Sequence, residues 1–309
     1  MRATQTAIEA RLKETDVFIE LLDARLPGSS ANPLLAQLAG RKPTLKVLNK
    51  QDLADPLRTE QWLAHYNAQP GTRAIGLDAS VVAPARALAA ACRQLVPHRG
   101  GMAKPLRVLI GGVPNVGKST LINTLVGKKA SKTGDEAGIT RHEQRIVLAD
   151  DFYLYDTPGM LWPKILVPES GDLLAASGAV GRNAYDEESV ALFLLQPLQQ
   201  DYAALLEARY RWGWAPTDIA AMPDHALLEA VGRKRGALLP GGRVNLQKAA
   251  EALLTDFRSG AIGRITLETP ERFARWLAAA RQAEAERLAE RQQRLRERRG
   301  QARPPQART

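Results

Sequence analysis

Residues 112–119 read GVPNVGKS and match the pattern G-x-x-x-x-G-K-[ST], a phosphate-binding loop. The apolar run at residues 106–110 (LRVLI) indicates a strand directly before this loop, and residues 119–126 indicate a helix directly after it. Such a loop needs this context, because its backbone N–H groups and the N-terminus of the helix must face the same phosphate. The motif therefore predicts an α/β fold with a mostly parallel sheet.

Each part of the loop has a chemical role in the predicted site. The glycines let the backbone approach the phosphates, Lys118 reaches the outer phosphates, and the hydroxyl of Ser119 is a suitable ligand for Mg²⁺. We expect a nucleotide-phosphate site formed by Gly112, Val113, Pro114, Asn115, Val116, Gly117, Lys118, Ser119 and Thr120.

A second motif, DTPG at residues 156–159, follows another predicted strand. Asp156 can hold the Mg²⁺ shell there, and the N–H group of Gly159 can meet the γ-phosphate. Between the two motifs, the sequence GIT offers the hydroxyl of Thr140 as a further Mg²⁺ ligand, which we prefer to that of Thr133. Together the three segments predict the phosphate half of a GTPase site.

The base-recognition half lies upstream, where residues 49–52 (NKQD) match N-K-x-D just past a strand predicted at residues 43–48. The carboxylate of Asp52 can accept hydrogen bonds from N1–H and the 2-amino group of guanine. Adenine has no such donor pair, so it would leave this charge unpaired. Lys50 would lie along the base plane and Asn49 would brace the loop. These residues predict specificity for guanine.

Two other parts of the site are less well defined by the sequence. A second purine-contact loop should follow the next strand, near Asp78 and Ala79, but an ordinary turn explains that sequence equally well. Met160 follows Gly159, where many GTPases carry a glutamine that orients the attacking water, and methionine cannot do so. The catalytic group is therefore unknown at this level, and His142 is a weak candidate.

The order of the motifs is circularly permuted, because N-K-x-D usually follows the phosphate motifs and here precedes them. Strands and helices alternate as far as the DTPG motif. After Lys164 only helical patterns remain, at residues 187–198, 202–210, 223–231, 246–259 and 270–299. We predict a GTPase domain at residues 1–170, with helices on both faces of its sheet, and a small all-helical domain at residues 171–270. A basic tail, helical or disordered, follows at residues 271–309. The segment after Gly159 would then connect the nucleotide to the helical domain.

The charge of the chain indicates an anionic partner. Its 43 Lys and Arg exceed its 33 Asp and Glu by ten, and residues 281–309 hold nine Arg and four Glu. Nucleic acid is the commonest partner of such a surface, and a solvated tail without a partner is the alternative. No aromatic residue is interleaved with these arginines, so base stacking by the tail has no support.

The remaining composition limits the class of protein. No apolar run approaches the roughly 18 residues of a membrane span, and the first 16 residues lack the apolar stretch of a secretory signal. Cys92 is the only cysteine, lies in an apolar run, and reads as a small core residue in a reducing compartment. We expect a cytoplasmic protein, and no heptad pattern favours an obligate dimer over a monomer.

The segments LNKQD, GGVPNVGKSTLIN, GIT and DTPGMLWPK, in this order, resemble the circularly permuted GTPases of the ribosome biogenesis GTPase A (YlqF) family. The sequence DAR at residues 23–25, FRSG at residues 257–260 and GRI at residues 263–265 are also similar to that family. The resemblance extends to about Pro270. It implies GTP hydrolysis with Mg²⁺, binding of GTP and GDP, and a late role in assembly of the large ribosomal subunit, including its rRNA.

The resemblance further implies a potassium ion held near the phosphates by Asn115. Family members usually open with Trp-Phe-Pro-Gly-His-Met, whose histidine is a candidate water-positioning group, and Met1 falls where the last of these residues would stand. The arginine-rich extension after Pro270 is longer than the family core and would add rRNA contacts.

Two functions of different classes follow. The first is a GTPase assembly factor that binds the precursor of the large subunit through its helical domain and tail and is released on hydrolysis. The second is an RNA-binding module in which the nucleotide is a structural placeholder with negligible turnover. A GTPase acting on tRNA or a signalling protein fits the motifs less well, and Asp52 argues against an ATPase.

Overall fold

The computed structural model describes residues 2–101, 103–126, 144–162 and 164–301. Its centre is a six-stranded sheet in the order β3-β2-β1-β4-β6-β5, in which all strands are parallel except the edge strand β5. The strands are β1 (Val17–Asp23), β2 (Thr44–Asn49), β3 (Thr72–Gly76), β4 (Leu106–Gly112), β5 (Gln144–Ala149) and β6 (Phe152–Asp156). The predicted mostly parallel sheet is confirmed.

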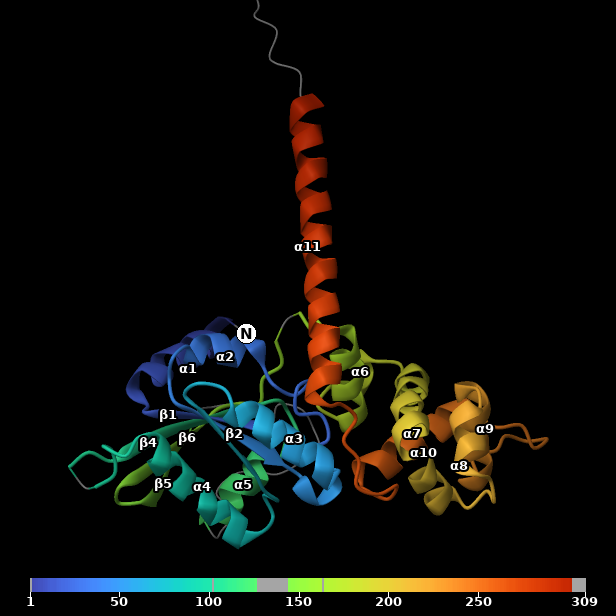
Figure 1. Cartoon of the computed structure of the whole chain (residues 1–309), viewed down its shortest axis with the longest axis horizontal. Helices are drawn as coiled ribbons and strands as arrows, with labels where there is room; N and C mark the ends of the chain where they lie inside the picture. The colour runs from blue at the N-terminus through green and yellow to red at the C-terminus, as the bar shows by residue number, and fades with distance from the viewer. Residues whose placement is uncertain (1, 102, 127–143, 163, 302–309) are drawn as a thin grey trace, which may run out of the picture.

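Helices cover both faces of the sheet and continue beyond it as a separate group (Figure 1). Those of the sheet region are α1 (Arg2–Glu14), α2 (Pro33–Ala39), α3 (Pro56–Asn67), α4 (Val82–Leu95) and α5 (Lys118–Val126). Those that follow are α6 (Pro168–Ser177), α7 (Glu187–Tyr210), α8 (Pro216–Ala221), α9 (Asp224–Lys234), α10 (Leu246–Arg258) and α11 (Pro270–Gln301). Two short 3₁₀ helices, η1 (Gln51–Leu53) and η2 (Arg182–Ala184), complete the set among the described residues.

The alternating directions of the side chains along β1 explain why helices cover both faces of the sheet. Ile19 and Leu21 belong to a buried cluster that includes residues of α4 and α5. Phe18 points to the opposite face, where it packs in a second cluster with Ile8 of α1 and Leu35 of α2. Because successive strand residues face opposite sides, a strand that is buried along its whole length, as β1 is, requires cover on both faces.

The chain order produces a switch point beside β1. From β1 the chain builds β2 and β3 on one side, then returns to place β4 on the other. The carboxyl ends of these strands lie at one edge, where Asp23 pairs in register with Asn49, and Ile110 of β4 pairs with Asp156. In open α/β sheets, ligands bind at the carboxyl edge at such a switch point.

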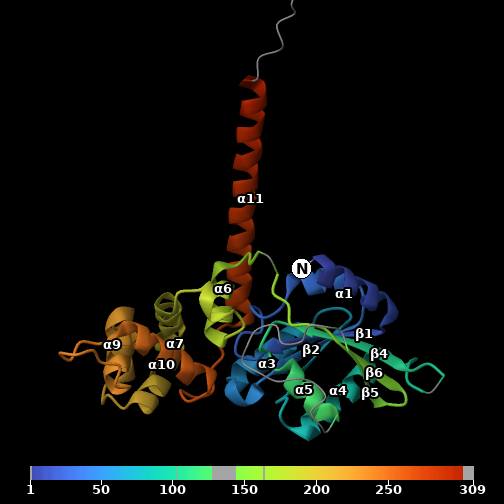
Figure 2. The same ribbon diagram turned by 180° about the vertical axis from the view of Figure 1, so that it is seen from behind.

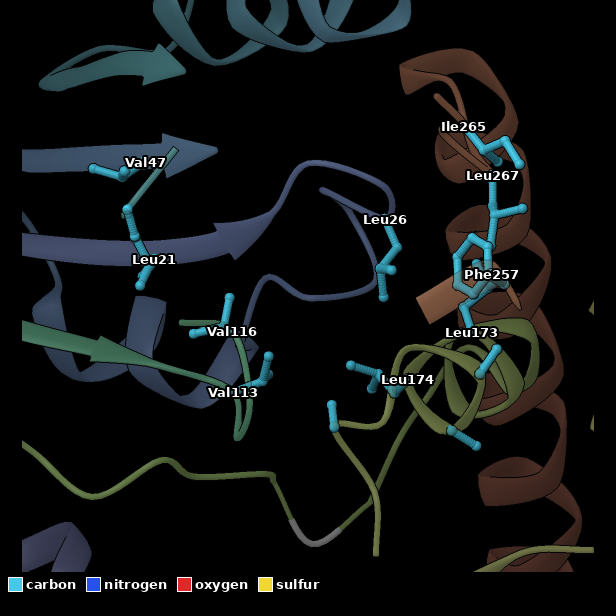
Figure 3. Close-up of a cluster of buried hydrophobic side chains, with 14 of the residues drawn as sticks. Leu21, Leu26, Val47, Val113, Val116, Leu173, Leu174, Phe257, Ile265 and Leu267 are labelled. Carbon is cyan, nitrogen blue, oxygen red and sulfur yellow. The ribbon is translucent and has the colours of Figure 1, made fainter. Parts of the chain in front are cut away.

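The later helices pack around α7, which contacts α6, α8, α9 and α10. Figure 2 shows this helical group beside the sheet domain, with α11 projecting from the region between them. One buried cluster continues across the junction: it includes Leu21 and Val116 on the sheet side, and Leu174 of α6 and Phe257 of α10 on the helical side (Figure 3). The helical group is therefore held to the sheet domain by a shared core.

Several local predictions differ from the structure. Three helices, α1, α6 and α8, were not predicted, and residues 187–210 form one helix instead of the two expected at residues 187–198 and 202–210. That helix has a break at Tyr202, whose φ of −139° and ψ of 27° are not helical. The predicted boundary between two helices therefore coincides with an interruption of the helical backbone. Of the alternatives for the tail, the described part is helical as far as Gln301.

The division into domains at residues 1–170, 171–270 and 271–309 stays a prediction. Helix α6 begins at Pro168 and α11 begins at Pro270, which lies close to the predicted limits. None of the helices in the described part of the chain is both long and apolar enough to cross a membrane.

Candidate functional site

The phosphate-binding segment turns from β4 into α5 through two constrained glycines. A Cβ atom on Gly112 would lie 2.6 Å from the carbonyl oxygen of Leu21, so only glycine lets the loop start this close to β1. Gly117 has a φ of +96°, and a side chain there would collide with the amide of Asn49. The helix α5 then begins at Lys118, which places its N-terminus at the loop.

Asn49 joins three loops at the carboxyl edge of the sheet. Its Nδ2 donates to the carbonyl of Val116 at 2.7 Å, and its Oδ1 accepts from the N–H group of Ala79 at 2.8 Å. The residue is buried, so both bonds are made away from water. The structure thus brings the NKQD segment, the phosphate-binding segment and the loop after β3 together, as the motif predictions require.

Lys118 and Asp156 form a buried pair at the centre of this edge. The ammonium group of Lys118 donates to Oδ1 of Asp156, while Oδ2 has no hydrogen-bond partner among the described residues. Burial raises the pKa of Asp156, against the opposing effect of Lys118. A buried carboxylate oxygen without a partner is costly, and a bound cation would satisfy it.

Ser119 lies half-buried one residue beyond this pair, at the start of α5. A hydroxyl and a carboxylate are ligands that suit Mg²⁺, so the residues present fit the predicted metal. The third predicted ligand, Thr140, lies outside the described residues, as do its alternative Thr133 and the catalytic candidate His142.

Lys50 ends in an ion pair that the motif alone does not indicate. Its Nζ lies 2.9 Å from Oδ2 of Asp23, and the guanidinium of Arg25 contacts both carboxylate oxygens of Asp23 at 2.9 and 2.8 Å. Burial would raise the pKa of Asp23, but Arg25 and Lys50 together hold it below its ordinary value. Burial also lowers the pKa of Lys50, and Asp23 opposes that shift.

Arg25 carries this cluster across to the helical group. Its Nη1 donates to the carbonyl of Phe257 at 3.3 Å, and its guanidinium lies 4.8 Å from the centroid of the Phe257 ring. The next residue, Arg258, donates to the carbonyls of Ala176 and Ala175 at the end of α6, at 2.8 and 2.9 Å. A chain of contacts therefore runs from Lys50 to the C-terminus of α6.

A second connection starts at the phosphate-binding segment. Asn115, with a positive φ of 56°, donates from Nδ2 to the carbonyl of Gly178 at 2.8 Å. Gly178 caps α6 in the left-handed conformation, with a φ of 84°. Both predicted halves of the nucleotide site are thus bonded to α6 or its end.

The segment after α10 supports the loop that carries the predicted guanine contacts. Arg264 donates from Nε to the carbonyl of Ala54 at 2.8 Å and from Nη2 to that of Gln51 at 3.0 Å. The N–H group of Ile265 donates to the carbonyl of Leu53 at 2.9 Å. These bonds fix η1, where the carboxylate of Asp52 is exposed and has no hydrogen bond or ion pair to another described residue.

The sequence indicates the segments that contain Asp23, Arg25, Arg258 and Arg264 only through their resemblance to a family. It did not predict what these side chains contact. Their partners lie far away along the chain, and no local pattern encodes such pairs. The signal that the sequence offered was the Asp-x-Arg pattern directly after an apolar run. Both charges are buried, and charges in such a position are expected to be paired, because unpaired charges are rarely buried.

The other residues considered for the site, Met160, Gly159 and Asp78, lie in three different environments. Met160 is buried in one cluster with Ile8, Leu12 and other apolar residues, none of which belongs to the phosphate-binding segment. Gly159 lies beside Pro114, where a Cβ atom would come within 3.0 Å of the proline Cα. Asp78 accepts from the N–H group of Ser80 at 2.8 Å and so caps its own turn, and its purine contact stays a prediction.

A phosphate-binding loop beside an N-K-x-D loop, at the switch point of a mostly parallel sheet, defines a P-loop GTPase with circularly permuted motifs, an enzyme that hydrolyses GTP. Residues 107–212 match the family model described as 50S ribosome-binding GTPase. Ribosome biogenesis GTPase A of Bacillus cereus is 39% identical over 280 residues, covering 88% of this chain and 93% of the relative. The chain belongs to the ribosome biogenesis GTPase A family.

Two further similarities agree with this assignment. Mitochondrial ribosome-associated GTPase 1 of Bos taurus is 33% identical over 280 residues, covering 84% of each chain. The GDP-bound structure of TM YlqF has a TM-score of 0.65 at 26% identity, covering 86% of this chain and 99% of that one. The predicted family and fold are thereby confirmed.

Proposed function

We propose that this GTPase is a Mg²⁺-dependent assembly factor of the large ribosomal subunit, which binds precursor particles under the control of GTP and leaves them after hydrolysis. The observation that supports this most directly is the pair of connections between the nucleotide motifs and α6. Lys50 connects through Asp23, Arg25 and the chain of α10, and Asn115 connects directly to Gly178.

Recognition of the nucleotide is divided between the two halves of the site. Asp52 accepts the guanine N–H donors, while Asn49 holds the base loop against the phosphate loop. The backbone N–H groups of residues 112–119 and the ammonium of Lys118 surround the phosphates and balance the charge that develops on them during transfer. Phosphate binding offers Lys118 a new partner in place of Asp156.

Ser119 and Asp156 would hold Mg²⁺, with Thr140 as the third predicted protein ligand. The metal would neutralise charge on the outer phosphates. The free oxygen of Asp156 supports this assignment, because that buried atom lacks a partner among the described residues. Met160 contributes a backbone bond to Gly112 at 3.1 Å and no polar side chain, so the attacking water is oriented by another group, on this chain or on the ribosomal partner.

The ribosomal partner is inferred from the names of the relatives and from exposed positive charge. Exposed cations on the helical group lie near the end of α7, at the end of α9 and in the loop before α10, and others line α11: Arg211, Arg233, Lys234, Arg235, Arg243, Arg287, Arg291 and Arg294. Phosphodiester backbones are the partner that such surfaces attract. We assign rRNA contacts to these two regions.

The decisive experiment is GTP hydrolysis by the purified protein in potassium buffer, with and without large ribosomal subunits. We expect strong stimulation by the subunits, and its loss in Lys118→Ala. Control reactions contain small subunits at the same concentration. Tight GTP binding with no stimulation would favour the placeholder function instead.

A potassium ion near Asn115 is part of the same proposal. The Nδ2 of this side chain bonds to Gly178, so an ion there would lie where the two parts of the molecule meet. Initial rates in KCl and NaCl at equal ionic strength measure the effect, and equal rates would remove the ion from the mechanism.

A further inference from the structure

A cleft of about 1070 Å³ separates the nucleotide motifs from the helical group. Lys50 and Asn115 line it on the sheet side, and residues around η2 line it on the helical side, among them Arg182, Asn183 and Tyr185. Its size is that of a cavity for a small ligand, and it opens directly beside both predicted halves of the nucleotide site.

The lining of the cleft is strongly positive. Arg25, Lys50, Arg182 and Arg258 all contribute, and none of the described residues that line it is Asp or Glu. Three of these cations are already engaged: Arg25 and Lys50 with Asp23, and Arg258 with carbonyls of α6. Arg182 is exposed and has no hydrogen bond or ion pair with another described residue.

We propose that Arg182, although it belongs to the helical group, binds a phosphate of the guanine nucleotide across this cleft. The inference rests on the proposed nucleotide site. A free guanidinium facing a cleft without acidic groups is suited to a phosphate, because its planar donors can form two parallel charge-assisted hydrogen bonds. Asn115, of the phosphate-binding segment, lines the same cleft.

The position of Arg182 is well defined by its neighbours. It begins η2, whose turn is closed by the bond from Ala184 N–H to Gly181 at 3.0 Å. Four residues earlier, Gly178 is fixed by Asn115, and three residues later the hydroxyl of Tyr185 accepts from Arg258 at 2.9 Å. The segment that carries Arg182 is thus anchored at both ends, while the side chain itself remains available.

This contact would make the nucleotide a direct bridge between the two parts of the molecule. The bonds from Arg25 and Asn115 connect protein to protein, and no nucleotide atom takes part in them. A bond from Arg182 to a phosphate exists only when nucleotide is bound. It therefore supplies the differential contact that a nucleotide-controlled arrangement of the helical group needs.

The test is the affinity of the full chain for GTP, GDP and guanosine, measured by competition against a fluorescent GDP analogue. For Arg182→Ala we expect about tenfold or greater loss of affinity for GTP and GDP, and no change for guanosine, which lacks phosphate. Arg182→Lys should recover part of the loss. Arg41→Ala, which removes an exposed arginine after α2 that is not part of the cleft lining, should match the wild type.

Unchanged GTP and GDP affinity in Arg182→Ala, with the wild type binding normally, would overturn this contact alone. An equal loss for guanosine would also overturn it, because the side chain would then act on the base or the fold. Failure of the wild type to bind any guanine nucleotide would instead overturn the nucleotide site and this contact with it. Circular dichroism checks that the variants remain folded.

Discussion

Asp52 presents an exposed carboxylate at the turn after β2, in a backbone fixed by Arg264 and Ile265. Because its oxygens form no hydrogen bond or ion pair with another described residue, they are free to accept donors from a base. The neighbouring motif residues differ in this respect, since Asn49 and Lys50 already have protein partners. Of these three motif residues, Asp52 is therefore the one whose side-chain oxygens are available to recognise the base.

Asp52→Asn should therefore exchange guanine for xanthine specificity. The amide presents a donor to the guanine N1–H and 2-amino groups, but it can pair with the 2-oxo group of xanthine. We expect GTP affinity to fall about 10- to 100-fold and XTP affinity to rise, measured by competition titration. Asp150→Asn, in the exposed turn between β5 and β6, is the matched control. Unchanged GTP affinity would remove Asp52 from base recognition.

Asp23 makes the stability of the fold depend on pH in the acid range. Its pKa in the folded protein is lower than the ordinary 3.8, because Arg25 and Lys50 outweigh the effect of burial. The folded state then binds fewer protons than the unfolded state. The stabilisation is complete above about pH 4 and is lost as the pH falls towards the folded pKa.

Urea unfolding between pH 7 and about pH 2.5 measures this effect. The wild type should lose free energy of unfolding as the pH falls below about 4, and Asp23→Asn should have a shallower dependence. The variant should also be about 3 kcal/mol less stable at neutral pH, because Arg25 stays buried without its partner. Asp150→Asn should retain the wild-type slope, and equal slopes in all three proteins would contradict the assignment.

At the scale of elements, the sequence predicts those strands, helices and turns whose signals come from residues close together in the chain. The run VFIELL gives β1, Asn32 accepts from Leu34 N–H and Leu35 N–H to cap α2, and the glycine loop gives the turn from β4 into α5. Helix α1 was not predicted from such local signals, because among its residues with described side chains only Ile8 and Leu12 are buried. A stripe of two residues is too short to show a period.

The residues of the candidate site also fall into two groups, those that belong to local motifs and those that pair across a long separation in the chain. Lys118, Asp156 and Asp52 were predicted because each belongs to a short motif with a fixed spacing. The bond from Arg25 to the carbonyl of Phe257 joins residues 232 positions apart. Pairing across such a separation is decided by tertiary packing, which a single sequence does not display.

The segment between α10 and α11 gives a prediction at this scale. Arg264 connects it to η1 through two carbonyls, so its loss should loosen the loop that holds Asp52. In Arg264→Ala we expect GTP affinity to fall about fivefold to tenfold, from the loss of bonds that position the loop. Nucleotide titration measures the change, and thermal unfolding separates it from global loss of structure.

Arg264→Lys is the companion variant, since one ammonium group can retain only part of the fork of donors. Its affinity should lie between those of the wild type and Arg264→Ala. If Arg264→Ala bound GTP as tightly as the wild type, the loop would be held sufficiently by the bond from Ile265 N–H to Leu53.

At the scale of the whole molecule, α11 stands away from both the sheet and the helical group (Figure 1). Its start is fixed, because Phe273 packs against Trp62 with ring centroids 6.1 Å apart. About three turns further along, Lys164 pairs with Glu284 at 2.5 Å, which connects α11 to the segment that follows the phosphate motif. Beyond that point the described side chains are exposed, so the outer part of α11 contributes little to the core, and its charge is available to the rRNA that we propose as its partner.

Arg287, Arg291 and Arg294 follow one another at spacings of four and three, so they share one face of α11. Replacing all three by Ala should weaken binding to an rRNA transcript of the large subunit. It should also reduce the slope of log affinity against log salt by roughly 2, since each phosphate contact contributes somewhat less than one. The helix should persist, because Ala has the highest helix propensity.

Replacing the same three residues by Lys keeps the charge and should keep most of the salt slope, which separates charge from packing. Circular dichroism on both triple variants checks the helix, and GTP affinity should stay at the wild-type value because the three arginines lie outside the nucleotide cleft. An Ala variant with the wild-type slope would show that α11 makes no phosphate contacts. The rRNA surface would then lie at the end of α9 and in the loop that follows it, where the exposed Arg233, Lys234 and Arg243 are the next residues to replace.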